Sequence, residues 1–304
     1  MPADLVDSWD DVPMALRPVA PMTGPFPMAP FLEAWRSHHT SSDTRAPIAV
    51  TATAALPLWI DRGVVRLSGE ADLTDYHSPL GVSIDECVAL VAHRFSGHTF
   101  SFDSLPREAL EPLASALAAA GVVPATSRHG ATLVIDLPAD AETWTASLPK
   151  RDRHELRRKR RRFVDVLGEP LLERRTDTEA FEAFITMHRS SRRNKGGFMT
   201  ESMERFFWSL IIDADASIDL ISVAGSPVAA AFGFVDTSAF YVYNSAYVED
   251  AADASPGIVL LASMIERSID GGLRRFDFLK GDEEYKYRLG AIDRPLTVLE
   301  GRFP

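Results

Sequence analysis

The residues with the clearest chemical potential lie near the C-terminus, directly after a short apolar run. In the stretch FDFLKGDEEYKYRLG, Phe276–Gly290, the strand-like residues 276–279 give way at once to acids, bases and two tyrosines. A carboxylate such as Asp277 can accept a proton, whereas Tyr285 and Lys286 can donate one or stabilise a developing negative charge. Ligand sites of α/β sheets tend to lie beyond strand ends. The three residues are therefore candidate catalytic groups, with a solvated turn as the alternative.

A second chemical feature is the tripeptide SPG, Ser255-Pro256-Gly257, which precedes an apolar periodic segment. We expect Ser255 to cap a helix and Pro256 to occupy its first position, where a missing N–H costs nothing. Gly257 carries no side chain, so a ligand can approach the backbone there. Open amides and the positive end of the helix dipole together favour an anion. The simpler alternative is that the tripeptide only begins a helix.

The elements that must position these residues follow from the apolar pattern of the second half. Helical periodicity is visible after Pro256, and it ends at Gly271-Gly272. The pattern before it predicts helices over 177–190 and 201–213, then strands over 218–223, 228–235 and 239–245 joined as an antiparallel meander. A further strand over 275–279 delivers the chain to the first candidate residues. Tyr243 and Asn244 lie at the end of the third strand of the meander.

The first half also alternates strands and helices, which favours an α/β fold. The pattern predicts a hairpin of strands 48–60 and 64–67, helices over 83–94 and 107–120, and strands over 98–102 and 131–136. One long helix over 141–164 is expected to lead into the second half. Asp75 and Tyr76, in the loop between Ser68 and Leu80, are further candidates on the first-half side of a cleft, with a common acidic loop as the alternative.

Composition limits the class of protein. The chain has 304 residues and a formal net charge of −11, so its surface as a whole should repel nucleic acid and anionic membrane. The segment 150–162 opposes this with a local charge of +7, which leaves −18 for the rest. We expect it to be a solvated helix. Cys87 is the single cysteine, which excludes an intramolecular disulfide and a cysteine-based zinc site. The acidic start MPADLVDSWDD does not resemble a signal peptide, and a cytoplasmic protein is the expectation.

Three spaced motifs carry a resemblance to a known family. YNSAY at 243–247, SPG at 255–257 and FDFLKGDEEYKYRLGA at 276–291 together resemble the FemAB-like branch of the GNAT acyltransferases, and within it the CelD/BcsL-type acetyltransferase domain proteins. FLEAW at 31–35 and LTDYHSPL at 73–80 look like the N-terminal signatures of that family. The resemblance implies an α/β fold of tandem GNAT-like lobes: a degenerate one over 1–145 and one with the donor-binding loop over 146–304.

The resemblance also implies a donor and an activity. Acetyl-CoA or another acyl-CoA would give its acyl group to an amine or hydroxyl of a small molecule or envelope precursor, by direct attack and without a metal. Lys286 matches a family lysine thought to stabilise charge on the acyl group. Apart from the resemblance, the residues before Gly196-Gly197 are candidates for the acceptor side, with a plain flexible loop as the alternative: Arg192, Arg193, Asn194 and Lys195. The implied donor site consists of Tyr243, Asn244, Ser255, Pro256, Gly257, Ile258, Val259 and Leu260, with backbone amides from Pro256 through Leu260 on the pyrophosphate.

Two alternatives remain open at this stage. One is an aminoacyltransferase that uses charged tRNA, as in the peptidoglycan-building relatives. The other is a catalytically silent module that binds a polymer or partner.

Overall fold

The computed structural model describes residues 2–39, 44–191 and 195–304, so the candidates Arg192, Arg193 and Asn194 lie outside the described part. The chain divides into two compact units, one of residues 1–132 with 294–304 and one of residues 133–293. The units therefore divide at different positions from the predicted lobes 1–145 and 146–304, and the C-terminal strand returns to the first unit. The assignment of two lobes along the sequence stays a prediction.

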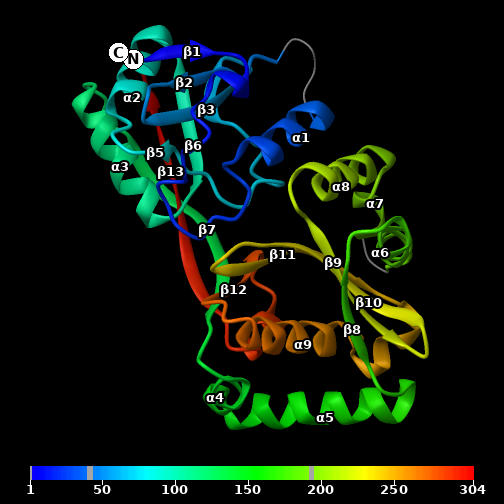
Figure 1. Cartoon of the computed structure of the whole chain (residues 1–304). Helices are drawn as coiled ribbons and strands as arrows, with labels where there is room; N and C mark the ends of the chain where they lie inside the picture. Colours follow the sequence, from blue (N-terminus) through cyan, green and yellow to red (C-terminus); the bar gives the residue numbers. More distant parts are fainter. Residues whose placement is uncertain (1, 40–43, 192–194) are drawn as a thin grey trace. The chain divides into compact units, whose positions relative to one another are not determined.

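The first unit is a mixed sheet with helices packed against it (Figure 1). Its strands are ordered β1-β2-β3-β4-β6-β13, with β5 on β3; β4 and β6 are parallel and the other described pairs antiparallel. Its core joins apolar residues of the sheet to α2 and α3. The strands are β1 (Asp4–Val6), β2 (Ile48–Val50), β3 (Ala54–Asp61), β4 (Val64–Leu67), β5 (Leu80–Gly81), β6 (Thr99–Leu105) and β13 (Ile292–Arg302), and the helices are α1 (Ala29–His39), α2 (Asp85–Arg94) and α3 (Arg107–Ala119).

The predicted single strand 48–60 is wrong, because the chain turns between β2 and β3. The hydroxyl of Thr51 accepts hydrogen bonds from the amides of Thr53 and Ala54, at 3.2 and 3.0 Å. This side-chain turn offers the backbone an alternative to the strand ladder, and the two halves pair antiparallel instead. The helices predicted over 83–94 and 107–120 are confirmed within two residues.

The second unit is also a mixed sheet, ordered β12-β11-β10-β9-β8, in which only β11 and β12 run parallel among the described pairs. The antiparallel meander β9-β10-β11 predicted from the sequence is confirmed. The strand β7 (Ala125–Asp136) runs from the first unit into the second. The other strands are β8 (Leu171–Arg175), β9 (Ser217–Val223), β10 (Ser226–Val235), β11 (Ala239–Tyr247) and β12 (Arg275–Lys280), and the helices are α4 (Ala141–Ser147), α5 (Lys150–Leu167), α6 (Thr178–Ser190), α7 (Lys195–Phe198), α8 (Glu201–Asp213), α9 (Pro256–Asp270) and α10 (Glu284–Arg288).

Strand alternation assigns the two faces of this sheet. On β10, Ala229 and Ala231 point into the core that includes α9. Phe232 points to the opposite face, where its ring contacts Phe184 of α6 and Phe207 of α8 at centroid distances of 5.7 and 4.7 Å. Helix α9 therefore covers one face, and α6 and α8 the other.

The predicted single helix 141–164 is two helices, α4 and α5. Pro149 precedes α5, and Leu148 before it is extended with ψ 145°, as the steric restriction on a residue before proline requires. Helix α5 packs on α9 through Leu156 and Phe163, and Arg160 donates to Glu266 of α9 at 2.8 Å. It lies along α9 on the side away from the sheet (Figure 1).

Candidate functional site

The strands β11 and β12 bring the two candidate segments to the same edge of the sheet. Their parallel register runs from Ala239–Arg275 to Tyr241–Asp277 and stops there, although β11 continues to Tyr247 and β12 to Lys280. The pairing therefore ends at Asp277. Beyond it the two chains lead separately to α9 and to α10.

Tyr243 is the extra residue of a β-bulge on β11. The register with β10 passes from Phe232–Asn244 directly to Gly233–Val242, so Tyr243 has no opposite residue. A bulge of this kind re-aims side chains and is over-represented beside active sites. The Tyr243 ring contacts Phe207 at a centroid distance of 5.4 Å. Asn244 follows it and is half-buried.

The start of α9 corrects two expectations. Ser255 occupies the N-cap position, but its side chain makes no capping hydrogen bond, and its backbone is left-handed with φ 55° and ψ 47°. The reason is that its amide donates to Ala252 to close the preceding 3-10 turn, which sets a backbone angle unlike that of an ordinary cap. Pro256 has no N–H and cannot hold a phosphate through an amide.

One amide remains open at this helix start. Ile258 and Val259 both donate to the carbonyl of Ser255, at 3.1 and 3.2 Å. For the amide of Gly257 the described part of the chain provides no hydrogen-bond partner. A Cβ built on Gly257 would meet only the ring of Tyr247, at 3.4 Å. Of the amides expected to bind the pyrophosphate, only that of Gly257 is open in the first turn among the described residues. It is accessible, and the positive end of the dipole of α9 lies at the same place.

The loop after β12 is held by Asp277 and Lys286, both of them buried. A carboxylate oxygen of Asp277 accepts the amide of Leu279 at 2.8 Å, and Leu279 has φ 59°. A bulky residue at positive φ is an outlier, and such strain clusters at functional sites. The Lys286 ammonium donates to the carbonyls of Lys280 and Gly281, at 2.9 and 3.2 Å.

A carboxylate oxygen of Glu283 completes the surroundings of this ammonium, at 2.9 Å. The three N–H donors of Lys286 thus have three acceptors, all from residues 280–283. In this structure the lysine fixes the shape of that loop. Its predicted role on the acyl group stays a prediction.

A small cavity joins the two candidate segments. Its volume is about 140 Å³, enough for a fragment of a larger ligand. Ile258 from the first turn of α9 and Tyr285 from α10 both line it. The residues that line it are Asp152, Glu155, Leu156, Lys159, Ile258, Glu284, Tyr285, Arg288 and Leu289.

The electrostatics of this cavity are set by burial. Burial and the negative charge of Glu283 raise the pKa of the Tyr285 hydroxyl, so the group stays protonated at neutral pH. Burial and the positive charges of Arg158 and Arg288 lower the pKa of Lys159, against the opposing effect of Glu155. The structure thus offers a protonated phenol beside a partly desolvated cation.

Asp75 belongs to the first unit, where it lies half-buried in the loop before β5. Its neighbour Tyr76 is buried, with its hydroxyl against Thr132 and the guanidinium of Arg294 4.7 Å from its ring centroid. These contacts fix the loop but assign no chemistry to Asp75, whose catalytic role stays a prediction.

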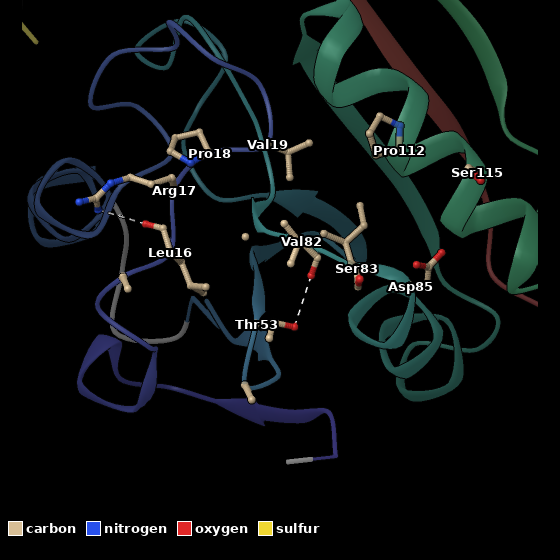
Figure 2. Close-up of a pocket in the computed structure, with 14 residues that line it drawn as sticks. Leu16, Arg17, Pro18, Val19, Thr53, Val82, Ser83, Asp85, Pro112 and Ser115 are labelled. Carbon is tan, nitrogen blue, oxygen red and sulfur yellow. Dashed lines mark hydrogen bonds between the residues drawn. The ribbon is translucent and has the colours of Figure 1, made fainter. Parts of the chain in front are cut away.

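A wider groove in the first unit contains none of the predicted residues. Its volume is about 810 Å³, and Figure 2 shows it between Arg17–Val19, the turn at Thr53, the residues after β5 and helix α3. Most of its lining is apolar, and no cluster of chemically reactive groups faces it. The cavity of the second unit is therefore the better candidate site.

Sequence reasoning missed three residues of this site. Lys159 was hidden in the basic run of α5, where nothing distinguishes an inward-facing lysine. Gly281 was overlooked, although a Cβ there would lie 2.5 Å from Glu283 and 2.9 Å from the Lys286 ammonium. The Lys-Gly pair after a strand was the available signal. The positive φ of Leu279 had no signal at all.

Among the described residues, no group of three or more histidine, cysteine, aspartate or glutamate side chains is placed to hold a metal ion. None of the helices in the described ranges is long and apolar enough to cross a membrane.

The second unit resembles a known protein family. Residues 150–287 match the family described as "Acetyltransferase (GNAT) domain", a range that contains Ser255–Gly257 and the candidate residues Asp277, Tyr285 and Lys286. No curated protein matches the chain.

Solved structures show the fold of nearly the whole chain. FemX is similar with a TM-score of 0.60 at 12% identity, covering 90% of both chains. A conserved protein of unknown function from Bacteroides thetaiotaomicron gives 0.61 at 12% identity, covering 88% of each. The C-terminal domain of a putative lysylphosphatidylglycerol synthetase from Agrobacterium fabrum gives 0.56 at 14% identity, covering 89% of this chain and 90% of that one. The predicted α/β, FemAB-like fold class is confirmed.

Proposed function

Residues 150–287 belong to the acetyltransferase (GNAT) domain family, which makes the protein a GNAT-type acyltransferase, and on that premise we propose that acetyl-CoA, or another acyl-CoA, is the donor. The acceptor would be an amine or hydroxyl of a small molecule or envelope precursor. The observation that carries the proposal is the open amide of Gly257 at the start of α9, in the same part of the sheet edge as the cavity between Ile258 and Tyr285.

The geometry supports a division of roles. The amide of Gly257 and the dipole of α9 would bind the pyrophosphate, with Ser255, Pro256, Ile258, Val259 and Leu260 shaping that turn. Tyr243 and Asn244, at the bulge where pairing of β11 with β12 ends, would lie along the thioester. The first set binds and orients the donor, and neither set needs a metal.

The transfer step needs one proton removed and one supplied. The acceptor's nitrogen or oxygen attacks the thioester carbonyl carbon, and the new bond forms as the carbon–sulfur bond breaks. The acceptor's proton passes to solvent water, and the departing thiolate takes a proton from a protein group that regains it from solvent. We assign the last task to Tyr285, because its hydroxyl-bearing side chain lines the candidate cavity. We assign Asp277 and Lys286 to holding the loop 280–283 in place.

A thermal-shift titration tests the donor. A donor at a hundred times its dissociation constant adds about 2.7 kcal/mol of stability, which corresponds to a rise of roughly 5–10 °C for a unit of this size. Gly257→Trp should abolish the rise, whereas Gly257→Ala should keep it, because the added methyl meets only Tyr247 at 3.4 Å. An unchanged melting temperature at saturating acetyl-CoA contradicts the proposal.

The likeness to FemX keeps one alternative in view, an aminoacyl group carried by tRNA. The discriminating experiment supplies the acceptor panel with acetyl-CoA in one arm and charged tRNA in the other. Transfer in the charged-tRNA arm and none in the acetyl-CoA arm would show that aminoacyl-tRNA, and not acyl-CoA, is the donor. Donor binding without transfer to any acceptor supports the catalytically silent module.

A further inference from the structure

The outward side of helix α5 is a basic surface over residues 150–162. Six of its exposed positions are basic, and they are occupied by Lys150, Arg151, Arg157, Arg158, Arg161 and Arg162; the other exposed positions are His154, Asp165 and Val166. We call these six residues the outer basic face. The apolar residues Leu156 and Phe163 are buried on the opposite side. The face is therefore a property of the folded helix and not only of the sequence.

The charges of this face are only partly neutralised within the chain. Arg158 pairs with Glu155 at 2.7 Å, while Arg162 and Asp253 are 3.9 Å apart. Lys150, Arg157 and Arg161 have no ion pair with any described residue. Because the protein has a net charge of −11, this helix is a local exception to the surface as a whole.

The chemistry of the face selects its partner. It carries no aromatic residue, since the one aromatic of α5, Phe163, is fully buried, so bases have nothing to stack on. The exposed apolar residue of α5, Val166, lies one turn beyond Arg162, so the attraction of the six basic residues for a partner is electrostatic. The helix of 18 residues presents a convex ridge roughly 27 Å long, whereas a single nucleic-acid strand is normally held in a groove; a duplex, whose major groove admits a helix, is the competitor that the experiment must exclude. An anionic surface that extends along the helix can contact the basic residues of 150–162 together.

We propose that the outer basic face docks the protein on an anionic lipid surface. Clusters of this size bind acidic headgroups at about 1 kcal/mol for each basic residue near the surface. The inner side of the same helix contributes Glu155, Leu156 and Lys159 to the candidate cavity, so docking would bring that cavity close to the lipid. The proposal stands on the charge of α5 and does not depend on the identity of the donor.

Co-sedimentation with vesicles tests it. The whole protein should bind vesicles of phosphatidylcholine mixed with phosphatidylglycerol, should not bind phosphatidylcholine alone, and should be released by high salt. Arg157→Glu with Arg161→Glu should weaken binding about 30-fold, which is about 2 kcal/mol. The matched control, Arg107→Glu with Arg205→Glu, changes the net charge equally on exposed arginines of α3 and α8 and should bind as the original does.

Three results would overturn the proposal. The first is no binding to phosphatidylglycerol vesicles at low salt. The second is an equal loss in the control variant, which would assign the effect to net charge and not to α5. The third is tight binding of an RNA or DNA duplex that Arg157→Glu with Arg161→Glu abolishes, with vesicles ignored; that result would make the face a nucleic-acid surface. Circular dichroism of both variants establishes that they are folded.

Discussion

Replacing Lys286 by methionine distinguishes two possible roles of this lysine: holding a loop in place, or acting only in the chemical step. The side chain is 4% exposed, and its ammonium donates to Lys280, Gly281 and Glu283 within 3.2 Å. Methionine fills similar volume but leaves these acceptors without the donor. If the contacts stabilise the fold as the structure indicates, the variant is less stable before any substrate is added.

The size of the effect follows from the exposure of the acceptors. A hydrogen bond to a charged group contributes about 1.5–3 kcal/mol, and a buried acceptor left unpaired costs about 1–3 kcal/mol. The Glu283 side chain is 48% exposed, and Gly281 is exposed too, so water can replace part of what is lost. We therefore expect a loss of about 2 kcal/mol, which lowers the melting temperature of a unit of this size by roughly 4–8 °C.

The assay is thermal unfolding followed by circular dichroism, with Lys150→Met as the control because Lys150 is exposed and has no described ion pair. The control should melt with the original protein. A Lys286→Met melting temperature equal to that of the control would refute the structural role. A large fall in kcat at unchanged stability would instead support the role on the acyl group that the family resemblance implies.

Two further predictions concern the loop and the first unit. Gly281→Ala should destabilise the protein by about 1–3 kcal/mol, because Gly281 has φ 110° and its Cβ would collide with Glu283; chemical denaturation that shows no loss would contradict this geometry. Although burial by itself raises the pKa of Asp103, hydrogen bonds from His77 and Ser104 and the charge of His77 bring it below its ordinary value. The stability contributed by Asp103 should be present above about pH 4 and lost as pH falls further, and Asp103→Asn should flatten that acid limb; parallel curves of melting temperature against pH would show the reasoning to be wrong.

The elements predicted most accurately are those whose packing repeats along one face. The meander 218–245 and the helices 201–213 and 256–270 could be predicted because each buries one face, which leaves apolar residues at regular intervals in the sequence. The predictions of one strand over 48–60 and one helix over 141–164 were wrong because single residues interrupt each element. Thr51 turned the chain with its hydroxyl, and Pro149 restricted Leu148. Both effects act locally against an apolar pattern that continues across them.

The C-terminal strand β13 was not predicted at all. It pairs with β6, about 200 residues earlier in the chain, and long-range pairing of this kind leaves little trace in a local window. Leu296 and Val298 alternate as a half-buried strand requires, and this was the one available signal.

The sequence predicted where in the chain the candidate site lies, but not which atoms its side chains contact. The spacing of SPG and FDFLKGDEEYKYRLG placed Ile258 and Tyr285 near each other, and the shared cavity agrees. The capping role of Ser255 failed because the preceding 3-10 turn fixes its backbone. The partners of Lys286 include two backbone carbonyls, which no residue-type pattern can reveal.

The central claim is that the start of α9 binds the pyrophosphate of the donor, and the structure of the protein crystallised with CoA tests it most directly. The account predicts a pyrophosphate oxygen about 2.9 Å from the amide nitrogen of Gly257, with the pantetheine arm directed toward Tyr285. A CoA molecule whose pyrophosphate is bound elsewhere, with the Gly257 amide facing only solvent, would contradict it.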